Sequence, residues 1–295
     1  MQSSLIFGGI MNVKLADPSF DLGGGVQLKQ TFAHLMSVNM MAFAPPKEER
    51  HHPGPWKAAR GGFGYDINVE IQVPIDGTRS SSLQAMETIW LFAALVRLAR
   101  CPYLMVPVIS SHPFDAIRDS AEEPILEPLE TENRLFAPSE RSDTVLDYEL
   151  LSWISRVLPT TADLMSRDKR FDSAFRAFDL CTIRGRASSS LLTVWGALEQ
   201  LFAPSTAELR YRVSSNIAAY LNPPGEERLA AFRKILNLYN HRSTAAHTAK
   251  DADQSALIES YVLMRNALVQ MIENRHVPSQ KELEEAIFSP GLPKA

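Results

Sequence analysis

Two side chains in the last quarter of the chain combine a group suited to proton transfer with a group suited to phosphate binding. Arg242 and His247 are separated by four residues in the stretch 236–249, LNLYNHRSTAAHTA. A phosphodiester attacked by its own 2′-hydroxyl must lose a proton there and gain one at the 5′-oxygen, and histidine suits both transfers because its pKa lies near neutrality. The planar, permanently charged guanidinium of arginine binds two phosphoryl oxygens at once. These two residue types could therefore support cleavage of a phosphodiester without a metal or other cofactor, with Arg242 on the phosphate and His247 as general acid and base, although spacing alone favours a helix-terminal histidine packed beside its neighbours.

The spacing of this pair restricts how it can form a site. Taken alone, an arginine followed five residues later by a histidine is a weak motif that chance also produces. On an ideal helix, five residues rotate two side chains about 140° apart, so they do not share a face. The site must therefore lie at a helix end or in a distorted turn, or be completed by another chain.

The C-terminal half of the chain has the apolar spacing of amphipathic helices. Apolar residues recur every three or four positions, and prolines or polar stretches separate the segments. Pro159 is expected to end the first helix. A bundle is the natural way to bury these apolar stripes. The predicted helices span 148–158, 171–181, 190–202, 209–221, 228–240 and 255–272.

The first half of the chain is of mixed α and β character. Residues 66–74 alternate polar and apolar side chains, which predicts a half-buried strand, and 103–109 predicts a second strand. Pro107 would place the second strand at an edge or a bulge. A helix is predicted between them at 82–100. We expect an α+β N-terminal domain at 1–138, then a polar junction, then an all-α helical bundle at 148–280.

Three consecutive blocks of the C-terminal half carry an ordered motif: LLTVWGALEQLF at 191–202, ELRYRVSSNIAAYL at 208–221 and EERLAAFRKILNLYNHRSTAAH at 226–247. Together they resemble HEPN domains, specifically those of ApeA-like proteins in bacterial anti-phage defence. In that family a helix with W-x-x-L-E-x-L is followed by a Y-R helix and by a helix running into L-Y-x-x-R-S-x-x-x-H. The resemblance implies an endoribonuclease that forms a homodimer, with two Arg…His pairs lining one cleft. It also implies an N-terminal domain that restrains the nuclease until an infection or stress signal arrives.

Three further residues are expected to support the pair. Glu199 lies in a helix otherwise lined with apolar residues, and an ion pair between Glu199 and Arg242 would orient the arginine. This structural role of Arg242 stands beside the direct catalytic one. Tyr239 is favoured as a core residue over a substrate contact. Ser243 could contact phosphate, whereas many family members have Asn, Asp or His after the arginine. A HEPN module that binds RNA or nucleotide without cutting it, and a dimerising adaptor protein, are therefore alternatives.

A second group of basic residues offers a candidate RNA-facing patch. The stretch 167–186 holds six basic and three acidic residues, including Arg184 and Arg186. His241, beside Arg242, could also contact RNA. A solvated helix face is the favoured interpretation of the stretch, because charge runs on helices are usually that.

Composition restricts the class of protein. The net charge of −4 and the pI near 6.0 argue against a broad basic surface, so any RNA contact should be local. Cys101 and Cys181 are the chain's two cysteines and have no CxxC spacing, so a disulfide framework or a zinc motif is not expected, which fits a reducing compartment. No signal peptide is recognisable, and the most apolar run, 89–96, is too short to span a bilayer. We expect a cytoplasmic protein without a membrane partner.

Overall fold

The computed structural model describes residues 4–36, 40–46, 52–58, 64–132, 134, 144–183, 185–203, 208–247 and 251–288. They fall into two units. The sheet unit comprises the described parts of Met1–Ile89, Met105–Thr131 and Asp143–Asp147, and the helical unit those of Trp90–Leu104, Glu132–Ser142 and Tyr148–Ala295. A sheet-rich N-terminal region followed by a helical C-terminal part is thereby confirmed, and each unit is described by itself below.

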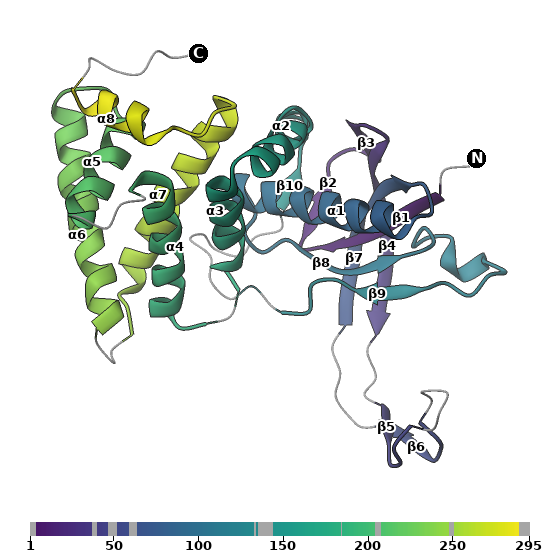
Figure 1. Cartoon of the computed structure of the whole chain (residues 1–295). Coiled ribbons are helices and arrows are strands. Elements are labelled where there is room, and N and C mark those ends of the chain that lie inside the picture. Colours follow the sequence, from purple (N-terminus) through teal and green to yellow (C-terminus); the bar gives the residue numbers. More distant parts are fainter. Residues whose placement is uncertain are drawn as a thin grey trace. The chain divides into compact units, whose positions relative to one another are not determined.

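The sheet unit is built on one antiparallel six-stranded sheet, visible in Figure 1. In β7, Ile67, Val69, Ile71 and Val73 are buried in alternation, which confirms the strand predicted at 66–74. Strands β1 (Ser4–Met11) and β4 (Val26–Met36) were not predicted: a Gly-Gly pair interrupts the apolar run of the first, whereas the polar–apolar alternation of the second is a strand signal that was missed. The strand order is β3 (Ser19–Gly23), β4 (Val26–Met36), β7 (Gly64–Ile75), β1 (Ser4–Met11), β8 (Met105–Ser110) and β9 (Leu126–Pro128).

The glycine pair in β1 allows close packing on both faces of the sheet. A Cβ at Gly8 would lie 2.8 Å from Ile71 and 3.0 Å from Ile89 of α1 (Arg79–Ala99). A Cβ at Gly9, on the opposite face, would lie 2.8 Å from the ring of Phe114. Only glycine fits both positions without displacing these side chains.

The second predicted strand is β8, and Pro107 lies at a bulge in it. β8 pairs with β1 on one side and β9 on the other, so it is not an edge strand. The register with β1 shifts between Gly9, opposite Val108, and Met11, opposite Met105, which leaves an extra residue in β8. The extra residue accommodates the proline, whose nitrogen cannot donate to the ladder.

Short pairings complete the sheet unit. β2 (Val13–Leu15) pairs in parallel with β10 (Thr144–Leu146), and β5 (Met40–Ala42) pairs antiparallel with β6 (Trp56–Ala58). A single 3-10 turn, η1 (Ile117–Asp119), follows β8.

The helical unit contains all six predicted helices of the C-terminal half and one that was not predicted. In Figure 1, α4 to α7 lie beside one another, and their shared core includes the fully buried Trp195, Phe202 and Tyr261. The additional helix, α8, starts with a capping box in which Glu282 accepts from the backbone N–H of Ser279 at 2.7 Å. The helices are α2 (Tyr148–Arg167), α3 (Lys169–Leu180), α4 (Ala187–Phe202), α5 (Leu209–Leu221), α6 (Glu226–His247), α7 (Gln254–Glu273) and α8 (Gln280–Phe288).

The prediction that Pro159 ends the first of these helices is wrong. α2 continues through Pro159 to Arg167. A proline inside a helix removes one hydrogen bond and costs roughly 3 kcal/mol. The buried stripe of α2 extends on both sides of the proline, from Ile154 to Leu164, and its packing offsets that cost.

A buried ionic cluster lies inside the helical unit. Asp179 of α3 is 3% exposed and accepts hydrogen bonds from Arg97 Nε at 2.6 Å and Arg134 Nη2 at 3.2 Å. Trp90 Nε1 donates to the same carboxylate at 3.0 Å. Burial raises the pKa of Asp179 and the two guanidinium groups lower it, and the net direction is downward. The aspartate is therefore held ionised between two arginines.

One described helix, α1, is long and apolar enough to cross a membrane by length and composition alone. Of the 18-residue apolar window in α1 that meets this criterion, 56% is buried within the structure. Core helices of globular proteins meet the same criterion.

Candidate functional site

The Arg242 and His247 pair lies inside a helix. The predicted helix at 228–240 is longer in the structure, because α6 continues from Glu226 to His247 without interruption. The two side chains therefore project about 140° apart and differ by roughly 7.5 Å along the helix axis. No distorted turn brings them onto one face within a single chain. Of the three arrangements that the spacing allowed, a helix end and a site completed by another chain are the ones left.

Arg242 is held by a carboxylate of another helix. Its Nη2 lies 3.0 Å from Oε1 of Glu199 on α4, and the two side chains are 25% and 16% exposed. The hydroxyl of Tyr239, one turn earlier on α6, donates to the same Oε1 at 2.9 Å. The guanidinium also lies over the Tyr239 ring, 5.5 Å from its centroid. The ion pair predicted between Glu199 and Arg242 is thus present, and Tyr239 joins it.

Aromatic packing fixes this group against the core. The Tyr239 ring meets Trp195 of α4 edge to face, with centroids 5.1 Å apart. Trp195 donates from Nε1 to the hydroxyl of Ser260 on α7 at 3.0 Å. Tyr239 is 7% exposed, as expected of a core residue, and its hydroxyl also serves the polar group. Ser260 was not identified from the sequence, although a polar residue within the buried stripe of α7 is a usable signal.

The environment of Tyr239 favours its neutral form. Burial, and then the hydrogen bond to the Glu199 carboxylate, raise the pKa of its phenol to about 12. A phenol that stays protonated remains a donor to Glu199. The Glu199 carboxylate therefore accepts hydrogen bonds from the neutral phenol of Tyr239 and from the charged guanidinium of Arg242, on successive turns of α6.

Part of the Arg242 guanidinium has no partner. Its Nε is buried and makes no hydrogen bond with any of the described residues. An unpaired buried donor is energetically unfavourable, by about 1–3 kcal/mol. Because this Nε is shielded from solvent, an acceptor such as a phosphoryl oxygen could reach it only after neighbouring side chains move.

The remaining predicted residues lie on the same end of α6 and are more accessible. His247 is exposed, whereas Ser243 and His241 are half-buried. The structure brings Arg242, Tyr239 and Glu199 together and leaves His247 outside that group. Asn240, which the sequence did not single out, accepts a hydrogen bond from Arg210 of α5 at 2.9 Å.

The basic stretch 167–186 is largely paired with acidic neighbours. Arg167 contacts Asp163, Arg170 contacts Asp168 at 2.6 Å, and Arg176 contacts Asp172 at 2.9 Å. These pairs fit a solvated helix face. Of the two arginines predicted to face RNA, Arg186 is exposed at the start of α4, and Arg184 lies outside the described residues. Across the described part of the chain, no three His, Cys, Asp or Glu side chains gather as a metal site.

Comparisons with known proteins add no relative. No family model matches the chain, and searches of curated proteins and solved structures gave no match. The site is therefore interpreted from its residues and their geometry.

Proposed function

We propose that the protein is a metal-independent endoribonuclease of the HEPN type that acts in anti-phage defence or toxin-like growth arrest. The observation that carries the proposal is the fixed position of Arg242, held by Glu199 and Tyr239 with its Nε unpaired, on the helix that ends in the exposed His247. The order of the three sequence blocks in 191–247 supports the same assignment.

The proposed chemistry assigns one role to each side chain. The imidazole of His247 takes the proton from the 2′-hydroxyl or gives one to the departing 5′-oxygen. The guanidinium of Arg242 binds the phosphoryl oxygens and offsets the charge that builds up as the 2′-oxygen attacks phosphorus. The products are a 2′,3′-cyclic phosphate and a free 5′-hydroxyl.

The divergence of the two side chains supports a site made by two copies of the chain. Arg242 faces α4 and His247 projects about 140° away, so one chain does not aim both at the same phosphate. In a homodimer, His247 of one copy could lie beside Arg242 of the other copy, and the two side chains would form one complete site. The sheet unit would then regulate the nuclease activity of the helical unit, and the substrate of that activity would be RNA.

One observation favours a second candidate function. The Glu199 carboxylate already neutralises Arg242, as a purely structural arginine would require. Under that interpretation the helical unit is a non-catalytic RNA-binding or nucleotide-binding module, or a dimerising adaptor.

The experiment that separates these functions measures binding and cleavage on the same protein. Purified wild type and His247→Ala are incubated with total RNA and a tRNA pool, and binding is followed by mobility shift. A nuclease loses cleavage and keeps binding in His247→Ala, whereas a binding module shows no cleavage by the wild type. His276→Ala is the matched control, because His276 is exposed and paired with Glu282 at 3.0 Å, away from the site.

A mixing experiment tests the two-copy site. Arg242→Gln and His247→Ala are each expected to be inactive alone. If the residues act across the dimer, an exchanged mixture of the two variants regains cleavage, since every mixed dimer contains one site in which an intact Arg242 faces an intact His247. A mixture that stays inactive while dimers demonstrably exchange would contradict the shared site.

A further inference from the structure

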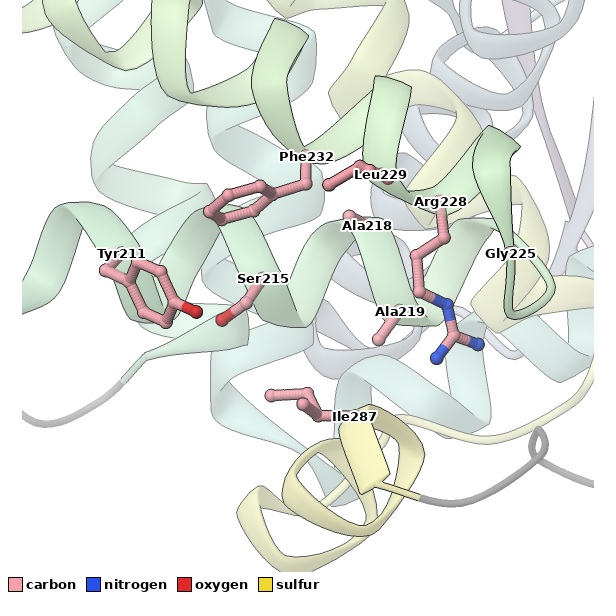
Figure 2. A pocket seen from close by; sticks show the side chains of 9 residues that line it. All are labelled: Tyr211, Ser215, Ala218, Ala219, Gly225, Arg228, Leu229, Phe232 and Ile287. Carbon is pink, nitrogen blue, oxygen red and sulfur yellow. The ribbon is translucent and has the colours of Figure 1, made fainter.

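A pocket of about 260 Å³ lies in the helical unit between α5, α6 and α8, on other residues than those of the proposed nuclease site. Figure 2 shows its side chains surrounding one space, with the rings of Tyr211 and Phe232 at one end and the guanidinium of Arg228 at the other. The two rings meet edge to face, with centroids 5.3 Å apart. The pocket therefore has an aromatic end and a cationic end.

Small residues create the space. Ala218 and Ala219 of α5 line it where longer side chains would fill it, and Gly225 lines it at the start of α6. Ile287 of α8 covers the opposite side (Figure 2). The volume is slightly below the roughly 300–1,000 Å³ of pockets for drug-sized ligands, so an occupant would have about ten non-hydrogen atoms.

Arg228 is a positive charge without an acidic partner in the described structure. Its Nε donates to the carbonyl of Asn222 at 3.0 Å and its Nη1 to the carbonyl of Ala286 at 2.8 Å. No carboxylate of the described residues lies within ion-pair distance of it, and burial alone lowers its pKa. Arg212, which also joins α5 to α8, differs because it pairs with Glu284 at 3.2 Å.

The surroundings of Arg228 favour a single negative charge on the occupant. Beyond this one cation the walls are mostly apolar, so a dianionic phosphate would lack partners for its second charge. A carboxylate matches one guanidinium, and an attached ring or branched chain matches the apolar end.

We propose that this pocket binds a small monocarboxylate with an aromatic or branched apolar body. The carboxylate pairs with Nη2 of Arg228, which makes no hydrogen bond with the described residues, and the apolar body packs between Ala219, Ile287 and the two rings. Such a ligand contacts three helices at once and stabilises the packing of α8. This proposal does not depend on the proposed nuclease function.

Calorimetric titration of the full chain tests the proposal, with phenylacetate and 4-methylpentanoate as probes and their neutral amides as matched controls. At least one acid should bind roughly tenfold or more tightly than its amide, because a bond to a charged group is lost in the amide. Arg228→Gln should abolish that preference. Arg212→Gln should retain it, because Arg212 does not line the pocket.

A second variant keeps the test decisive if Arg228→Gln unfolds. Ser215 lines the pocket, and its hydroxyl bonds only within its own helix, to the carbonyl of Arg212 at 3.1 Å. Ser215→Leu should fill the space and eliminate binding of the acids. Equal affinities for acid and amide, binding that persists in Ser215→Leu, or no binding of either acid below about 10 mM would each overturn the proposal.

Discussion

The carboxylate of Glu199 on α4 and the guanidinium of Arg242 on α6 form an ion pair at 3.0 Å, across 43 positions of sequence. Because Tyr239 donates to the same carboxylate, two successive turns of α6 are joined to one residue of α4. The orientation of Arg242 therefore depends on α4 and not only on its own helix. An arginine held in this way would be pre-organised for the phosphate that the proposed nuclease function requires.

A double-mutant cycle should measure this coupling. Glu199→Gln and Arg242→Gln are each expected to lower the free energy of unfolding, with a coupling energy of about 1–3 kcal/mol, because the pair is mostly buried. Urea denaturation of the wild type, the two single variants and the double variant gives the value. The exposed pair Arg156 and Glu273, at 2.8 Å between α2 and α7, is the control and should couple by at most about 1 kcal/mol. Equal coupling in both pairs would show that Glu199 does not hold Arg242 specifically.

The ionisation of Tyr239 should depend on its place in the fold. Its pKa is raised to about 12 from the ordinary 10.0, chiefly by burial and then by the bond to Glu199. Above pH 10 the unfolded chain releases this proton while the folded chain keeps it, so stability falls as the pH rises from 10 to 12. Tyr239→Phe should show a smaller fall over that range.

Tyrosinate absorbance provides a direct measurement of the same effect. The difference between the titrations of the folded wild type and folded Tyr239→Phe should have its midpoint near 12. Tyr220 and Tyr261, whose pKa values burial also raises, are present in both proteins and cancel. A midpoint near 10 would mean that the hydroxyl is not held by Glu199.

Asp179→Asn should destabilise the helical unit more than an ordinary substitution. The variant removes the buried negative charge that Arg97 and Arg134 share. The expected loss in the free energy of unfolding is about 3–5 kcal/mol. Asp119→Asn, which breaks an exposed pair with Arg118, should change it by less than about 0.5 kcal/mol. A small effect of Asp179→Asn in urea denaturation would contradict the buried-cluster description.

Pro159→Ala should stabilise the protein. α2 already continues through this exposed position, so alanine restores a backbone hydrogen bond without disturbing the core. We expect the free energy of unfolding to rise by about 1–3 kcal/mol, less than the full cost of a helical proline because proline also restricts the unfolded chain. Thermal and urea unfolding would measure this increase. A lower stability of Pro159→Ala would show that α2 depends on the proline.

Helix α6 is longer in the structure than its apolar periodicity predicts. Apolar periodicity predicted the helix up to residue 240, because no apolar side chain suitable for the core follows Tyr239. The polar segment that follows stays helical with its side chains mostly exposed or half-buried, which periodicity does not detect. The Glu199 ion pair was predictable, since a lone carboxylate in an apolar stripe needs a partner.

Other features depended on the tertiary arrangement. From the local sequence, Pro159 predicts the end of a helix. Only the packing of α2 against its neighbours keeps the helix continuous through the proline. The contact between Trp195 and Ser260 depends on how α4 and α7 cross, which no local pattern contains. The same holds for the pocket around Arg228, whose lining comes from three helices.

The most direct test of the central claim is the analysis of product ends after RNA is incubated with the protein in EDTA. Wild type should cut RNA and leave 2′,3′-cyclic phosphates and 5′-hydroxyls, and His247→Ala should leave the RNA intact. That result would establish metal-independent cleavage that depends on His247. Intact RNA with both proteins, or equal cutting by both, would contradict the account.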